Sequence, residues 1–148
     1  MRRVLIVDDD PDVREMLRTV LEWDGYTLET ANDGVAALEI LTRTDENWLV
    51  LLDINMPRMT GLEVCAHLAA LDGSSARFLV VLMTAGFFPD GDVPPPVRAL
   101  IAKPFHLDTL LDLVAKFVRA GADVDDEPES RVARTSAGDI YGRAHPAA

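Results

Sequence analysis

Five short runs of apolar residues are spaced along the chain, and segments with helical periodicity separate them. Four of the runs are almost continuously apolar, which is typical of strands buried on both faces of a parallel sheet. The remaining run, Tyr26 to Thr30, alternates apolar and polar residues, as a strand at an exposed edge does. The predicted strands are Val4 to Val7, Tyr26 to Thr30, Trp48 to Leu52, Phe78 to Met83 and Ala99 to Ala102.

Four segments repeat apolar residues at the spacing of an amphipathic helix. They predict helices over residues 13–21, 35–41, 62–69 and 107–118. The second helix has a start signal in Asn32-Asp33-Gly34, and Asp10 before Pro11 is predicted to cap the first. Strands and helices that alternate with short connections predict an α/β fold with a doubly wound parallel sheet.

The connection between the last two predicted strands breaks this alternation, because it contains four prolines. Proline lacks the amide donor that a helix interior needs, so Pro94-Pro95-Pro96 predicts a loop in place of a helix. Phe87 and Phe88 in this loop either pack inward against the sheet or form a surface that binds a partner. After a single domain of residues 1–119, the apolar periodicity stops, and residues 120–148 are predicted to be a flexible tail of acidic and small residues.

Composition narrows the function classes. The chain has 148 residues, 49% of them hydrophobic, and a formal net charge of -11. Such a surface disfavours nucleic acids and anionic lipids, which proteins bind mainly through Lys and Arg. No apolar run approaches the roughly 20 residues that cross a bilayer. The first apolar run is too short for the core of a signal peptide. The single cysteine, Cys65, cannot form an internal disulfide. We therefore expect a cytoplasmic location, no membrane or nucleic-acid partner, and binding to proteins, a metal ion or small molecules.

Polar residues follow four of the predicted strands where each strand ends, namely Asp8, Asp9, Asp53, Thr84 and Lys103. Ligands bind at the carboxyl edge of a doubly wound sheet, so these residues should converge in one cleft. Three carboxylates in one cleft need a compensating cation, and oxygen ligands suit Mg²⁺. A carboxylate can attack phosphorus, while a metal ion, a lysine and a hydroxyl stabilise the transferred group. The pattern therefore favours phosphoryl transfer to an aspartate.

The segments VLIVDDDPDVREML, LLDINMPRMTGLE, VVLMTA and AKPF, in this order, resemble the receiver domain of two-component response regulators. The resemblance covers residues 3 to about 119 and implies a flavodoxin-like sheet of five parallel strands in the order 2-1-3-4-5. It further implies an Mg²⁺-dependent switch that takes its phosphoryl group from a histidine kinase or phosphotransfer protein. Because the sequence shows no output domain, we expect a stand-alone switch that acts through protein contacts or passes its phosphoryl group onward in a relay. Such a switch acts on a downstream protein target as a monomer or weak dimer. It is no enzyme beyond catalysing its own phosphorylation and the hydrolysis of its aspartyl phosphate.

The same resemblance assigns roles to individual residues. Asp53 is the phosphoacceptor. The metal ligands are Asp8, Asp9, Asp53 and the backbone carbonyl of Asn55. The residues that contact the phosphoryl group are Thr84 and Lys103. Thr84 is expected to move toward the phosphoryl group on activation, and Pro104 matches the position of a cis peptide bond in the family. Leu100 stands where the family usually has a switch aromatic, so we expect an altered signalling surface.

Two other functions stay open at this point. A haloacid-dehalogenase-like phosphatase would use Asp8 as nucleophile, since Asp8 and Asp10 have D-x-D spacing after a strand. That family also needs a second acidic pair at a strand end, and the later pair, Asp125 and Asp126, lies in the predicted tail. The altered loop leaves a third interpretation, a receiver-like adaptor that works without phosphorylation.

Overall fold

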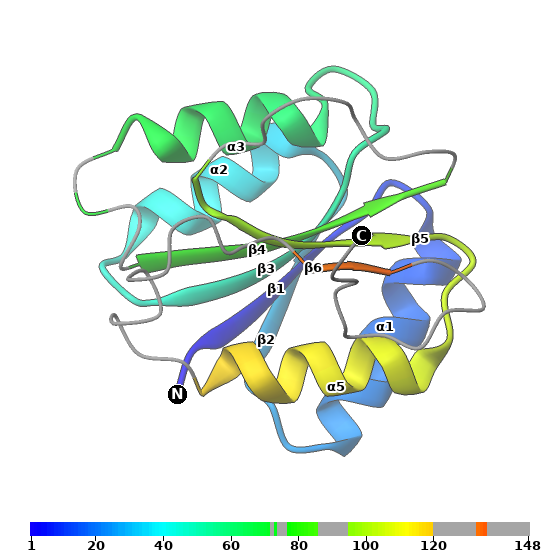
Figure 1. Ribbon diagram of the computed structural model, residues 1–148. Helices are drawn as coiled ribbons and strands as arrows, with labels where there is room; N and C mark the ends of the chain where they lie inside the picture. The colour runs from blue at the N-terminus through cyan, green and yellow to red at the C-terminus, as the bar shows by residue number, and fades with distance from the viewer. Residues whose placement is uncertain (72, 74–76, 86–94, 120–132, 136–148) are drawn as a thin grey trace.

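The computed structural model describes residues 1–71, 73, 77–85, 95–119 and 133–135, and a parallel sheet forms its centre (Figure 1). Its strand order is β2-β1-β3-β4-β5-β6, so the order 2-1-3-4-5 predicted for the first five strands is confirmed. Every neighbouring pair is parallel. The strands are β1 (Arg3–Val7), β2 (Leu28–Ala31), β3 (Trp48–Asp53), β4 (Phe78–Thr84), β5 (Val97–Ala102) and β6 (Ala133–Thr135).

Strand β6 is a part of the sheet that the sequence analysis did not predict. It pairs with β5, with Arg134 opposite Leu100, and so makes a sheet of six strands instead of five. Its three residues fall in the segment assigned to the tail, where no apolar run marks a strand. The rest of that segment, residues 120–132 and 136–148, lies outside the described residues, and its flexibility stays a prediction.

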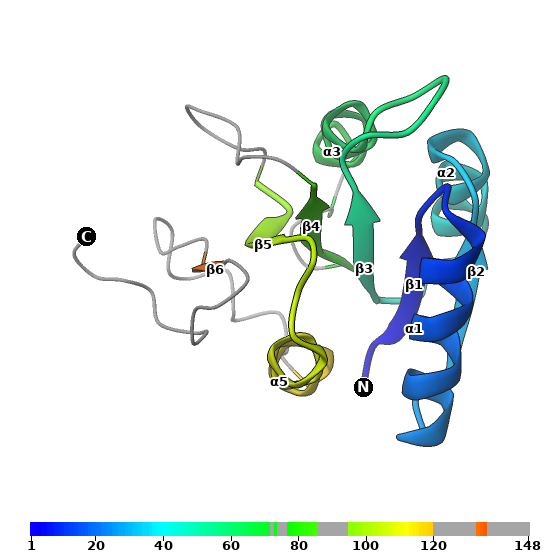
Figure 2. The same ribbon diagram turned by 90° about the vertical axis from the view of Figure 1, so that its right-hand side faces the viewer.

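Helices cover both faces of the sheet, as Figure 2 shows in a view along its edge. Helices α1 (Pro11–Trp23) and α5 (Leu107–Val118) lie on one face, and α2 (Gly34–Arg43) and α3 (Gly61–Ala69) lie on the other. The predicted Asp10 cap is confirmed, because the Asp10 carboxylate accepts the N–H of Asp12. Within the predicted start signal of α2, the Asp33 carboxylate caps the helix by accepting the N–H of Ala36. Each cap satisfies a donor that the first turn of its helix leaves unpaired.

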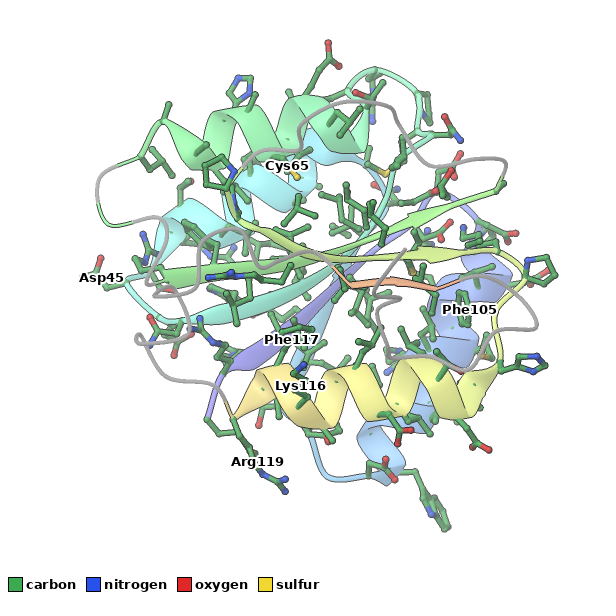
Figure 3. The ribbon with its side chains drawn as sticks, viewed as in Figure 1. Asp45, Cys65, Phe105, Lys116, Phe117 and Arg119 are labelled. Atoms are coloured by element: carbon green, nitrogen blue, oxygen red, sulfur yellow. The ribbon has the colours of Figure 1, made fainter. Side chains whose placement is uncertain are left out.

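The core consists of two apolar layers, one on each face of the sheet, because successive residues of a strand point to opposite faces. On β3, Val50 and Leu52 belong to the layer under α2 and α3, whereas Leu49 and Leu51 belong to the layer over α1 and α5. Cys65 packs in the first layer, and burial raises the pKa of its thiol to about 12. Figure 3 shows Cys65 and Phe117 pointing from α3 and α5 toward the sheet.

The connection between β4 and β5 is only partly described. Residues 86–94 lie outside the described residues, so the predicted proline-rich loop and both roles considered for Phe87 and Phe88 stay predictions. Where the description resumes, Pro96 accepts the N–H of Val80 through its carbonyl at 2.8 Å, and β5 begins at the next residue. Among the described helices, none has the length and apolar character that would let it span a membrane.

Candidate functional site

The carboxyl ends of β1 and β3 bring three aspartates together, as the sequence predicts. Asp8 is fully buried and Asp53 is 5% exposed, whereas Asp9 is open to solvent. Each of the three offers a carboxylate oxygen, and these oxygens lie within 4.8 Å of one another. Like charges at this separation repel strongly in a partly buried place, so the cluster needs positive charge nearby.

Lys103 supplies part of that charge from the end of β5. Its Nζ lies 2.6 Å from Asp8 Oδ2 and 3.6 Å from Asp53 Oδ1. The backbone fixes its position, because the Lys103 N–H donates to the carbonyl of Thr84 at 2.6 Å. The Lys103–Pro104 peptide bond is cis, as predicted. The lysine thus connects the ends of β4 and β5 to the acidic cluster.

Thr84 closes β4 beside this cluster and is 3% exposed. The loop after Asp53 is joined to β4 by the Ile54 N–H, which donates to the carbonyl of Met83 at 2.9 Å. Leu100, at the position of the usual switch aromatic, is fully buried in the layer under α2 and α3 and pairs with Leu82. The proposed movement of Thr84 stays a prediction.

The electrostatics of the cluster concentrate on Asp53. Burial and the neighbouring Asp8 carboxylate raise the pKa of Asp53 to about 6, although Lys103 and the backbone N–H of Asn55 act in the opposite direction. The carboxylate is therefore ionised at neutral pH at a considerable cost in free energy. A cation or an electrophile bound there would relieve that cost.

The donor set fits a hard divalent cation. Three carboxylates within reach of one ion are ligands of the kind that Mg²⁺ takes, together with carbonyl oxygens and water. Asn55 follows in the loop after β3, and its backbone N–H lowers the pKa of the Asp53 carboxyl. Its carbonyl as a further ligand stays a prediction.

Sequence reasoning missed the contacts that hold Asp8 in place. Its Oδ1 accepts the N–H of Asp10 at 2.9 Å, and its carbonyl accepts a hydrogen bond from Arg14 Nη1 at 2.8 Å. Arg14 lies in the first turn of α1, so the helix that Asp10 caps also secures the acid before it. Asp10 belongs to this cap and is absent from the acidic cluster found among the described residues, which disfavours a D-x-D catalytic pair.

Sequence reasoning also missed how the loop after Asp53 closes. The Gly61 N–H donates to the carbonyl of Ile54 at 2.8 Å, and a Cβ on Gly61 would lie 2.4 Å from the carbonyl oxygen of Asp53. Thr60 and Glu63 form a capping box at the start of α3. The T-G-L-E pattern carries this signal and could have been found from the sequence. The loop therefore returns tightly against the acidic site.

Comparison with known proteins agrees with this geometry. Residues 4–115 match the family model of the response regulator receiver domain. Response regulator MprA from Mycobacterium ulcerans (strain Agy99) is 40% identical over 139 residues, which are 90% of this chain and 57% of that protein. The chain thus spans about half the length of the curated relatives it matches, and the expectation of a stand-alone domain stays a prediction.

Two solved structures extend the comparison. Response regulator TrrA from Thermotoga maritima, in complex with Mg²⁺ and BeF, matches with a TM-score of 0.67 and 34% identity over 78% of this chain and 98% of that one. A structure of histidine kinase ThkA in complex with TrrA matches with a TM-score of 0.65 and 33% identity over 78% and 97% of the two chains. Fold, site and sequence agree: the chain belongs to the response regulator receiver domain family.

Proposed function

We propose that this receiver domain is a phosphorylation-dependent signalling switch in which Asp53 accepts a phosphoryl group from a histidine kinase or phosphotransfer protein. The observation that carries the proposal is the position of the Asp53 carboxylate. It lies at the end of strand β3, almost buried, between the carboxylates that follow β1 and the ammonium of Lys103. The solved complexes of TrrA with Mg²⁺ and BeF and with a histidine kinase support this choice of cofactor and partner.

In the proposed reaction, an oxygen of the Asp53 carboxylate attacks phosphorus as the bond from phosphorus to the donor's imidazole nitrogen breaks. The leaving imidazole takes up a proton from solvent, and the product is an acyl phosphate on Asp53. Lys103 offsets the charge of the incoming phosphoryl oxygens, and the Thr84 hydroxyl donates to one of them. Water later attacks the acyl phosphate and releases inorganic phosphate, which restores the carboxylate.

The acidic residues around Asp53 would hold Mg²⁺ through Asp8, Asp9, Asp53 and the carbonyl of Asn55. Bound there, the ion supplies positive charge to the phosphoryl group in transfer. Asp8 is prepared for this role, because Asp10 and Arg14 already fix its carboxylate and its carbonyl. Asp9, which is exposed, leaves the site open to water on that side.

A groove of about 450 Å³ beside Lys103 is the surface that we propose for the phosphate donor. It is mostly apolar and is lined by Val13, Met16, Ala85, Lys103, Pro104 and Phe105. Lys103 belongs both to this groove and to the acidic site. A protein seated on the groove would therefore present its phosphohistidine close to Asp53. Met16 is 41% exposed on α1 and is available for such contact.

The proposed function can be tested with a small phosphodonor. We expect one phosphoryl adduct in the intact mass of the protein after incubation with acetyl phosphate and Mg²⁺, and none for Asp53→Asn or with a chelator present. A receiver known to react under the same conditions serves as a control. If that control reacts and the native chain gains no adduct, the switch is excluded and the phosphorylation-independent adaptor is favoured.

A further inference from the structure

The loop between β3 and α3 holds a strained turn next to the acidic site. Arg58 has a φ of 67°, in the left-handed region that side chains other than glycine rarely adopt. The N–H of Met59 donates to the carbonyl of Pro57 at 2.7 Å, which closes a three-residue turn around Arg58. A γ-turn with positive φ at its centre is rare and strained, so contacts elsewhere must hold it in place.

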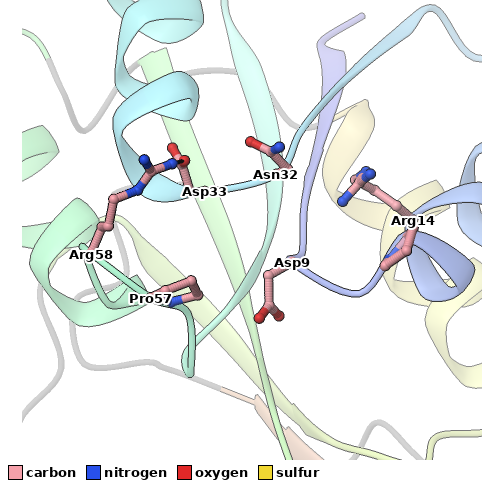
Figure 4. A pocket seen from close by; sticks show the side chains of 7 residues that line it. Asp9, Arg14, Asn32, Asp33, Pro57 and Arg58 are labelled. Carbon is pink, nitrogen blue, oxygen red and sulfur yellow. Dashed lines mark hydrogen bonds and ion pairs between the residues drawn. The ribbon is translucent and has the colours of Figure 1, made fainter.

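The side chain of Arg58 provides such a contact, because its Nη2 forms an ion pair with Oδ2 of Asp33. Asp33 is a firm anchor: its side chain is 6% exposed, and its Oδ1 caps α2 by accepting the N–H of Ala36. Figure 4 shows the guanidinium of Arg58 reaching Asp33 on one side of a groove, with the Asp9 carboxylate facing the same groove. The ion pair therefore joins the strained turn to the start of a helix.

The strained turn has little freedom relative to the acidic site. Its loop begins at Ile54, whose N–H is bonded to Met83, and ends at Gly61, whose N–H is bonded to the carbonyl of Ile54. Between these two anchors, the backbone N–H of Asn55 lies close enough to the Asp53 carboxylate to lower its pKa. A change of the backbone at Arg58 must consequently be absorbed by the few residues that include Asn55.

We propose that the ion pair between Arg58 and Asp33 is a positioning clasp, which sets the backbone of Asn55 for Mg²⁺ and for Asp53. Neither residue of the clasp touches the reacting atoms. The clasp acts by keeping the loop in its strained conformation, and the inference rests on the proposed metal and phosphoacceptor site. Arg58 and Asp33 thereby tune the affinity of that site for the metal ion.

An ordinary surface ion pair is the competing interpretation, since the Arg58 side chain is 69% exposed and exposed pairs contribute little to stability. Two observations separate this pair from an ordinary one. Its aspartate is almost buried and has a second, structural hydrogen bond, and its arginine occupies the centre of a strained turn. A surface pair would not require either feature.

Metal binding by the unphosphorylated protein tests the clasp. We expect Arg58→Ala and Asp33→Asn each to raise the dissociation constant for Mg²⁺ about tenfold in calorimetric titration. Losses of this size are typical when a residue that supports a metal ligand is removed. Asparagine can still cap α2, so Asp33→Asn removes the ion pair and keeps the helix start. The double variant should be no weaker than either single one, because both remove the same interaction.

If the two side chains affected Mg²⁺ binding only through their charges, the two variants would have opposite effects, so measuring both separates this explanation from the clasp. Removing the positive Arg58 would tighten Mg²⁺ binding by electrostatics, and removing the negative Asp33 would weaken it. Arg58→Ala with unchanged or tighter binding would overturn the clasp. Arg58→Lys should restore most of the affinity, and Arg43→Ala, which removes a surface pair with Glu29 at the other end of α2, should leave it unchanged.

Hydrogen exchange of the metal-free protein separates the clasp from the proposed function. We expect faster exchange of the Met59 and Gly61 amides in Arg58→Ala and in Asp33→Asn, with the β3 amides unchanged. Equal exchange in the native protein and both variants would overturn the clasp. If the native chain binds no Mg²⁺, the proposed function fails, and the exchange rates still decide whether the pair holds the loop.

Discussion

Two properties of Asp53, its ionised carboxylate and its buried position, oppose each other when no cation or phosphoryl group is bound. Its carboxylate must be ionised to attack phosphorus or to bind a cation, yet burial and Asp8 raise its pKa to about 6. The native state therefore carries an ionised group that would be more stable in water. Function at this residue comes at the expense of folding stability.

This conflict predicts a stabilising substitution. The pKa of Asp53 is about 6 in the folded protein and near its ordinary value of 3.8 when unfolded, so the native state holds the proton more tightly. Stability should then fall as pH rises from about 4 to about 6, and Asp53→Asn should remove this fall. We expect the variant to be about 1–3 kcal/mol more stable at neutral pH without Mg²⁺, measured by urea unfolding. A variant that is only as stable as the native protein, or less stable, would show that the ionised Asp53 carboxylate does not destabilise the fold.

At the scale of elements, apolar periodicity predicts strands β1 to β5 and the four described helices, because each has a face that must be buried. The features that were not predicted lack this periodicity. Strand β6 is three residues long in a polar segment, and its pairing with β5 depends on contacts far away in sequence. The same holds for Arg58 and Asp33, which lie 25 positions apart and meet only because two loops cross the same edge of the sheet.

The β3–α3 loop offers a test at the scale of elements. A methyl group on Gly61 would lie 2.4 Å from the carbonyl oxygen of Asp53, so the loop or the end of β3 must shift in Gly61→Ala. We expect a loss of about 2–4 kcal/mol in stability and at least tenfold slower phosphorylation by acetyl phosphate. Gly25→Ala is a control for the reaction rate: alanine is strained there by the positive φ, but its Cβ would meet no atom within 4 Å, so phosphorylation should keep its native rate. Equally slowed phosphorylation in both variants would contradict a tight return of the loop against Asp53.

The groove between α1 and the β5–α5 connection can be tested apart from the chemistry. Met16→Glu places a charge among the apolar residues that line it, and leaves the acidic cluster unchanged. We expect phosphotransfer from a phosphohistidine protein to slow about tenfold, because desolvating the new charge opposes binding. Phosphorylation by acetyl phosphate should keep its native rate. A variant that loses both reactions equally would place the defect in the fold or the site and not in partner binding.

For the whole molecule, the sheet is what turns scattered residues into a site. Asp8 and Lys103 are 95 positions apart and lie 2.6 Å from each other at the carboxyl edge. The sequence predicts this convergence because apolar runs locate the ends of the buried strands. In a doubly wound parallel sheet, the carboxyl ends of the strands lie at one edge, where ligands bind. The anchoring of Asp8 by Arg14 and of Arg58 by Asp33 could not be predicted in this way, since many exposed arginines have the same local pattern.

The most direct test of the account locates the phosphoryl group. After incubation with acetyl phosphate and Mg²⁺, borohydride reduces an aspartyl phosphate to homoserine, which peptide mass spectrometry assigns to one position. We expect the homoserine at residue 53, in the peptide that contains the end of β3. Homoserine at residue 8 would contradict the account, since it would make Asp8 the nucleophile and favour the phosphatase.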